Sequence, residues 1–213
     1  MGILKNGPFG GFTGKVNNLV SYELNGQQIL KSVAGPSKKP ATIAQLNNQK
    51  QMKVINAFVK GAEAFIKTGF HPGAVGTKKN FHNLAVQYNK PQAMTGYYPD
   101  ITIDYSKIIL SKGSLTQATN VNATWVEEGL KFTWEHAVKP VWPETEDQVM
   151  LLAYTTEKDL HFYVTSGAKR TKGWDILEIP ASLHQERFEL YVSFVSNDRL
   201  DVADSQYIGA IEA

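Results

Sequence analysis

The sequence contains no cysteine, and this absence excludes several kinds of chemistry. Disulfide bonds, thiolate metal ligands and a cysteine nucleophile are all ruled out. No run of apolar residues is long enough to span a bilayer, and the N-terminus lacks the apolar core of a secretory signal. We therefore expect a cytoplasmic protein without membrane insertion, or one that is incorporated into a virion or another particle.

Acidic residues are scarce in the first half of the chain, and arginine does not occur before residue 170. Residues 1–100 contain 12 lysines and three acidic residues, a formal charge of +9, whereas residues 101–213 carry −7. This asymmetry suggests an anionic partner or contact between oppositely charged halves of neighbouring copies. Because arginine is the side chain that most often reads base edges, sequence-specific nucleic-acid binding is not expected.

Signatures of catalysis and cofactor binding are also missing. The run FGGFTGK at residues 9–15 resembles a phosphate-binding loop, but Phe9 stands where the first glycine belongs and Val16 replaces the magnesium-binding Ser or Thr. No G-x-S-x-G motif occurs, and no two histidines have the i, i+4 spacing of a helical metal site. Carboxylates cluster at residues 144–147 and 198–204, where we expect solvated loops. We expect a protein that is not an enzyme and has no catalytic residue, metal site or cofactor.

The N-terminal region combines a glycine-rich start with a clear hairpin signal. Five glycines fall among the first 14 residues, so this segment is expected to be an arm or an irregular loop. A β-hairpin is predicted next, because Asn25-Gly26 favours a type I′ turn and Val20, Tyr22 and Leu24 alternate with polar residues before it.

Two helices are predicted after the hairpin. A capping box begins at Thr42, and apolar residues at helical spacing extend a single helix to Gly69. A shorter helix is predicted from about Thr77 to Asn89, ended by Pro91. Large apolar residues are predicted to form one buried face of the first helix: Val54, Ile55, Phe58, Val59, Ala62, Phe65 and Ile66.

From Ile101 onward, apolar and polar residues alternate with the period of two that is typical of β-strands. The predicted strands, which turn residues separate, cover residues 101–110, 120–126, 130–135, 147–156, 160–166, 174–179, 188–195 and 206–211. In the strand 188–195, one face is predicted to carry Leu190, Val192 and Phe194, and the other Glu189, Tyr191 and Ser193.

These elements predict an α+β protein with two domains. Residues 1–100 would form a glycine-rich arm, a β-hairpin and a helical region. Residues 101–213 would form an antiparallel β-sandwich of the immunoglobulin or fibronectin III type. A small open barrel is the alternative for this second half.

Three stretches of the chain carry a family resemblance: GGFTGKVNNLVSYELNGQQILKS, KPATIAQLNNQKQMKVINAF and AVQYNKPQAMTGYYPDITIDYSKIILSKGSL. Together they resemble the domain of unknown function 6266 family of Bacteroidota, over essentially the whole chain. The resemblance implies no activity and no catalytic residues, because that family has no assigned function. The GKV-containing start and the Thr-x-x-Gln helix opening are also similar to small phage-associated structural proteins.

Four residues are candidates for contact with other molecules. Phe9, Phe12 and Lys15 are predicted to form an assembly interface, because two aromatic rings on a glycine-rich tether have little to pack against locally. Trp142 lies in a predicted loop, where an exposed ring could contact a sugar or a protein. The leading hypothesis is a structural protein that self-associates as a homo-oligomer, in a phage-like particle or another large assembly. The alternative is a binding module whose sandwich loops engage a glycan or a protein.

Overall fold

The computed structural model describes residues 2–4, 10–24, 26–33, 35, 39–136 and 142–212. The chain is a mixed α+β protein with antiparallel sheets, and it divides into two compact units, Met1–Thr42 and Ile43–Ala213. None of the described helices is long and apolar enough to cross a membrane.

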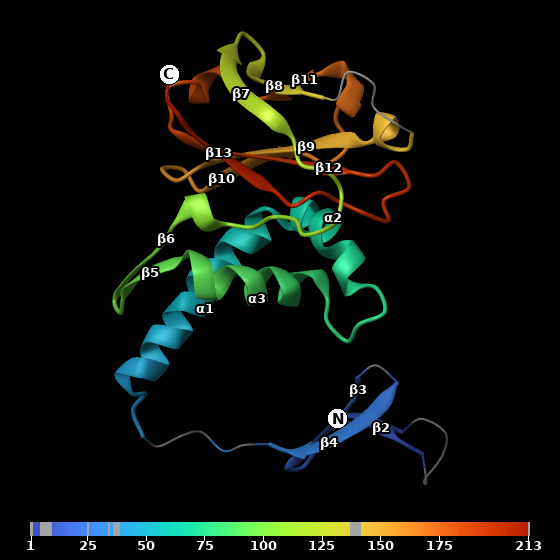
Figure 1. Ribbon diagram of the computed structural model, residues 1–213. Helices are drawn as coiled ribbons and strands as arrows, with labels where there is room; N and C mark the ends of the chain where they lie inside the picture. The colour runs from blue at the N-terminus through green and yellow to red at the C-terminus, as the bar shows by residue number, and fades with distance from the viewer. Residues whose placement is uncertain are drawn as a thin grey trace. The chain divides into compact units, whose positions relative to one another are not determined.

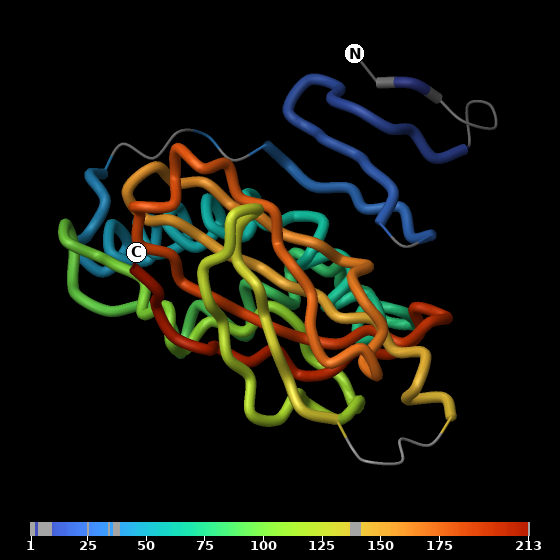
Figure 2. Tube along the Cα trace, turned by 90° about the horizontal axis from the view of Figure 1, so that it is seen from above, coloured from blue at the N-terminus to red at the C-terminus, as the bar shows by residue number. Residues whose placement is uncertain are grey.

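The first unit is a four-stranded antiparallel sheet in the order β1-β2-β3-β4. Its strands are β1 (Gly2–Leu4), β2 (Phe12–Val16), β3 (Leu19–Leu24) and β4 (Gln27–Ser32). The pairing of β3 with β4 confirms the predicted hairpin, which is drawn in blue in Figure 2. The expectation of an irregular arm was wrong for β1 and β2, because β1 pairs with β2 and β2 pairs with β3 in spite of the glycines.

Three α-helices begin the second unit: α1 (Ile43–Gly61), α2 (Glu63–Ala74) and α3 (Phe81–Ala93). The predicted apolar face is buried except for Val54, which is half-buried, and Phe58 and Phe65 are at most 3% exposed. The prediction of a single long helix was wrong, because Ala62 leaves the helical conformation at φ −98° and ψ 25°. The third helix also extends past its predicted end and contains Pro91, which has no N–H to donate to the carbonyl of residue 87.

A small hairpin follows α3, formed by β5 (Met94–Tyr97) and β6 (Asp100–Ile103). The predicted strand 101–110 therefore ends early. A short 3-10 helix follows it (Tyr105–Lys107), and the chain then continues as a connector, residues 108–115, without regular strand pairing.

The connector is held by hydrogen bonds from distant parts of the second unit. The side chain of Asn89 donates to the Ile109 carbonyl at 2.7 Å and accepts from the Ile109 N–H at 2.7 Å. The N–H groups of residues 110, 113 and 114 are bound by side chains of the C-terminal region, Ser205, Asp204 and Asp201. The connector is thus fixed at both ends although it forms no sheet.

The remaining strands form two antiparallel sheets with the orders β10-β9-β12-β13 and β11-β8-β7. Their bounds are β7 (Thr119–Val126), β8 (Gly129–Glu135), β9 (Gln148–Thr155), β10 (Leu160–Val164), β11 (Trp174–Glu178), β12 (Phe188–Val195) and β13 (Gln206–Ile211). Each of these strands corresponds to a predicted one, with ends that differ by at most a few residues.

The four-stranded sheet of the second unit is covered on both faces. One apolar cluster lies between the two sheets and includes Leu190, Val192 and Phe194 of β12. A second cluster lies between this sheet and the helices and includes Tyr191. The alternation predicted for β12 is therefore confirmed, and helices, four-stranded sheet and three-stranded sheet form three layers (Figure 1).

The structural units differ from the domains expected from the sequence, which placed a boundary near residue 100. The helices share a core with the four-stranded sheet, since Phe58 of α1 packs edge-to-face on Tyr154 of β9 with ring centroids 5.2 Å apart. A helical region that buries its apolar face against the strands belongs to the same compact unit as those strands.

Candidate interaction sites

The N-terminal sheet leaves most of its apolar side chains in contact with solvent. Ser21 is the one buried residue among those of the first unit that the structure describes. The exposed large apolar side chains of this unit are Ile3, Val16, Leu19, Tyr22, Leu24, Leu30 and Val33. Exposed apolar side chains that gather on one face are typical of interaction sites.

Strand register assigns these side chains to two faces, because directly paired residues of antiparallel strands point to the same side. Lys15 of β2 pairs with Val20 of β3, and Val20 pairs with Lys31 of β4. We call the face that carries this row the lysine face; its described members are Ile3, Thr13, Lys15, Val20, Tyr22, Leu24, Gln27, Ile29 and Lys31. The opposite face carries Phe12, Val16, Leu19 and Leu30.

Two of the residues predicted for an assembly interface, Phe12 and Lys15, lie on opposite faces of β2. Phe12 is half-buried on β2, and the side chain of Gln28 donates a hydrogen bond to its carbonyl. Lys15 is exposed on the opposite face of the same strand. Phe9 lies outside the described residues. The sequence alone did not predict that Lys15 and Lys31 lie in one row, because their alignment depends on the register of three strands.

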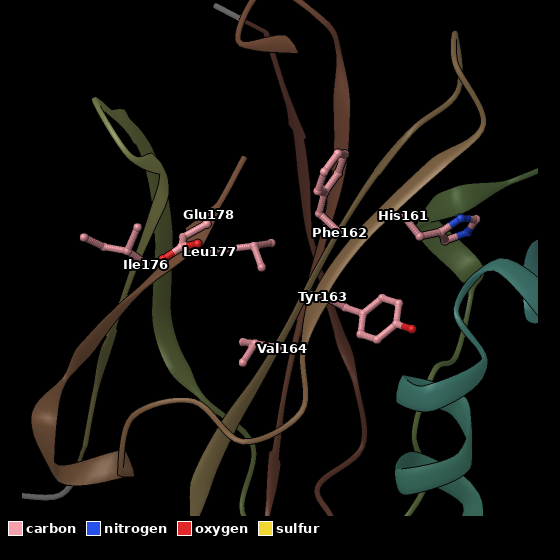
Figure 3. Close-up of a pocket in the computed structure, with 7 residues that line it drawn as sticks. All are labelled: His161, Phe162, Tyr163, Val164, Ile176, Leu177 and Glu178. Atoms are coloured by element: carbon pink, nitrogen blue, oxygen red, sulfur yellow. The ribbon is translucent and has the colours of Figure 1, made fainter. Parts of the chain in front are cut away.

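A groove lies between the edge strands β10 and β11 of the second unit (Figure 3). Its volume is about 540 Å³, and residues 161–164 and 176–178 line it. Val164 and Leu177 face one another across it, whereas His161 and Tyr163 point away toward the helices. Among the described strands, β10 pairs with β9 alone and β11 with β8 alone, so each presents one unpaired edge.

Two carboxylates lie at this groove and at the hollow beside it. Glu178 lines both the groove and an adjoining hollow of about 500 Å³, in which Glu128 also lies. Neither carboxylate forms an ion pair within the described part of the chain. We call residues 161–164 and 176–178 with Glu128 the acidic groove. Sequence reasoning missed it, because the two edge strands come from different sheets and are not neighbours in the chain.

His161 is a structural residue and not a free proton donor. Its ring lies against the rings of Tyr154 and Phe58, with centroids 4.4 and 5.1 Å away, and its Nε2 has no hydrogen-bond partner. Burial lowers the pKa of His161 to about 4, although Asp159 acts in the opposite direction. The imidazole is therefore neutral near pH 7.

The carboxylate clusters act within the fold. Asp201 and Asp204 accept hydrogen bonds from the connector, as described above, and Asp147 forms a buried ion pair with Arg170 at 3.1 Å. Within residues 2–136 and 142–212, as far as they are described, no group of three His, Asp or Glu side chains could hold a metal ion.

Trp142 is strongly exposed, at 77% of its surface, and is followed after Pro143 by a short 3-10 helix, Glu144–Glu146. An indole ring in this position is available for contact with a partner, as the sequence suggested. Its nearest chain neighbours before it, residues 137–141, lie outside the described residues.

Residues 11–209 match a family described as a family of unknown function, DUF6266. This match covers nearly the whole chain, in agreement with the resemblance seen in the three sequence stretches. No curated protein and no solved structure matches the chain.

Proposed function

The chain therefore belongs to the DUF6266 family, and because that family has no assigned function, we propose one from the geometry: a non-enzymatic structural protein that self-associates. The observation that carries this proposal is the N-terminal sheet with apolar side chains exposed on both faces. In the proposed contact, the lysine face of one copy binds the acidic groove of a second copy.

The size of the first unit supports a partner for this sheet. Units of about 40 residues usually need disulfides, metals or oligomerisation to be stable, and this chain contains no cysteine. An added contact would stabilise it, because burying a large apolar side chain contributes about 1.5–3 kcal/mol.

The area of the sheet supports contacts on both faces. Four strands about 4.8 Å apart, with at most six residues each, span roughly 400 Å² per face. A stable interface buries about 800 Å² on each partner. Each face supplies about half of this area, so one face alone makes a weak contact, and contacts of both faces with two different copies would together hold the sheet more strongly. Contacts of this head-to-tail kind build rings or filaments, as in a phage-like particle or another large assembly.

Charge supports the pairing of these two surfaces. Lys15 and Lys31 form no ion pair with any described residue, and the same holds for Glu128 and Glu178. Opposite charges on two apolar surfaces select a register and a partner. The groove also presents unpaired strand edges, to which an edge strand can add through backbone hydrogen bonds.

We further propose that the seven strands β7 to β13 form an immunoglobulin-like or fibronectin III-like sandwich. The strand order supports this assignment: the first, second and fifth strands share one sheet, and the third, fourth, sixth and seventh share the other. Such a sandwich would serve as the rigid part that presents the acidic groove.

Charge exchange tests the proposed contact. We would measure molar mass by size-exclusion chromatography with light scattering for Lys15→Glu/Lys31→Glu and for Glu128→Lys/Glu178→Lys. Each double variant should be smaller than the wild type, because like charges would then face one another. An equimolar mixture of the two variants should regain the larger mass, because each sheet again meets a groove of opposite charge.

The control is Lys53→Glu/Lys78→Glu, which makes the same charge change at two exposed lysines of the second unit. It should keep the wild-type mass. A wild type that is monomeric at tens of micromolar protein contradicts self-association. A mixture that fails to recover the larger mass contradicts the assigned surfaces.

A second candidate function is a binding module for a glycan or a protein, favoured by the exposed indole of Trp142. Exposed tryptophan rings stack on sugars and anchor protein interfaces. Under this alternative, Trp142→Ala abolishes ligand binding in a glycan array or a pull-down while the melting temperature stays the same. Unchanged binding partners in the variant would remove this alternative.

A further inference from the structure

A basic pocket lies between helix α2 and two loops of the second unit. Its volume is about 340 Å³. One row of α2 contributes Ala64, Lys67, Thr68 and His71, and the loops after β10 and β12 contribute Thr165 and Arg199. Positions 64, 67, 68 and 71 lie on one side of a helix, so their side chains reach the same opening.

Arg199 is fixed in this pocket by its own hydrogen bonds. Its guanidinium donates to the Thr165 carbonyl at 2.8 Å, to the Ser166 hydroxyl at 2.7 Å and to the side chain of Gln148. A guanidinium has five N–H donors, so these three bonds leave two for a ligand. Arg199 also has a φ of +62°, a conformation that is costly for a residue with a side chain and that occurs often at binding sites.

No described acidic side chain pairs with the two cations of the pocket. Lys67 and Arg199 form no ion pair with a described residue, and no acidic side chain lines the pocket. Asp198, which precedes Arg199, is engaged by the hydroxyl of Ser196 at 2.6 Å and the N–H of Leu200 at 3.0 Å. Its carboxylate therefore stabilises the loop that carries Arg199.

We propose that this pocket binds a tetrahedral oxyanion, the phosphate or sulfate group of a small ligand. A fixed guanidinium provides directed donors, a lysine provides a mobile point charge, and threonine and histidine provide further donors. The volume lies at the lower end of the roughly 300–1,000 Å³ typical of small-molecule sites. It leaves space beside the anion for part of the molecule that carries it.

Thermal unfolding tests this site with inorganic phosphate, sulfate and acetate at constant ionic strength. Bound ligand raises the melting temperature with a saturating dependence on concentration. Phosphate and sulfate also stabilise folded proteins in general, without saturation. The measured quantity is therefore the saturating part of the shift, compared between the wild type and matched variants.

We expect saturation with phosphate and sulfate and none with acetate. Lys67→Gln should raise the apparent Kd about tenfold, as expected for the loss of one charge-assisted contact. Lys53→Gln, at an exposed lysine of α1, should leave the Kd unchanged. Arg199→Lys keeps the positive charge but loses the planar guanidinium with its several N–H donors. It should weaken binding even though the protein still folds.

Three results would overturn the proposal. One is a wild type with no saturating shift in phosphate or sulfate. Another is an equal effect of Lys67→Gln and Lys53→Gln, which would reduce the interaction to general attraction by surface charge. The third is saturation by acetate as readily as by phosphate, which would assign the pocket to carboxylates. Lys67 is exposed, so its variant folds and each result is decisive.

Discussion

Acidification should destabilise the second unit through His161. The ring of this residue is packed between α1 and β10, and Gly61 allows this approach, since an added Cβ at Gly61 would lie 2.3 Å from the ring. The folded protein holds the imidazole neutral, because burial lowers the pKa of His161 to about 4. In the unfolded chain, a histidine has a pKa of about 6.5.

The sign and size of the effect follow from proton linkage. Between about pH 6.5 and pH 4 the unfolded chain binds a proton that the folded protein does not, so the free energy of unfolding falls as the pH falls. One pKa unit corresponds to about 1.4 kcal/mol, which gives a loss of at most about 3 kcal/mol, reduced by the partial exposure of the ring. The free energy of unfolding of a typical domain is about 5–15 kcal/mol in total.

Urea unfolding at several pH values measures this loss. Tryptophan fluorescence reports on the second unit, because all four tryptophans lie within it. The pH dependence of unfolding free energy should be steeper for the wild type than for His161→Leu, whatever the packing cost of that substitution. His71→Gln, at an exposed histidine, should show the same pH dependence of the unfolding free energy as the wild type in buffer free of phosphate and sulfate. Parallel profiles for wild type and His161→Leu would refute the reasoning.

Three further predictions concern stability and assembly. Arg170→Met should cost about 3–5 kcal/mol in urea unfolding, because it leaves Asp147 buried without its partner, and a double replacement of both residues by apolar ones should cost less. Gly61→Ala should cost about 1–3 kcal/mol by overpacking against His161, and a variant as stable as the wild type would contradict the close approach. Deletion of residues 2–14 should lower the molar mass of the assembly in light scattering while the melting temperature of the second unit stays the same.

The strands of the second unit could be predicted from the sequence because their alternation is local. The run FELYVSFV at residues 188–195 places Leu190 and Tyr191 on opposite faces in any β-strand. What lies against each face depends on elements far away in the chain. On the face with Tyr191, Glu189 and Ser193 are buried at 4% and 2% exposure although they are polar. Glu189 accepts a hydrogen bond from the Tyr207 hydroxyl, and the hydroxyl of Ser111 in the connector donates to Ser193.

Features that depend on two distant segments could not be predicted from the sequence. The interruption at Ala62 is invisible in the apolar spacing, which continues in phase from Phe58 to Ile66. The basic pocket joins Lys67 to Arg199 only after α2 and the loop after β12 have packed against the same sheet. For the interface residues, the pattern identified apolar and lysine positions on β2 but not which face each one occupies.

The connector has a consequence for how the protein folds. It forms no sheet of its own, and its backbone N–H groups are bound by Asn89 from α3 and by Ser205, Asp204 and Asp201 from near the C-terminus. These bonds cannot form until both ends of the second unit are in place, and such non-local contacts slow folding. The connector should therefore form its hydrogen bonds late in folding. Because it links the helices to the strands, both should unfold together in one cooperative transition.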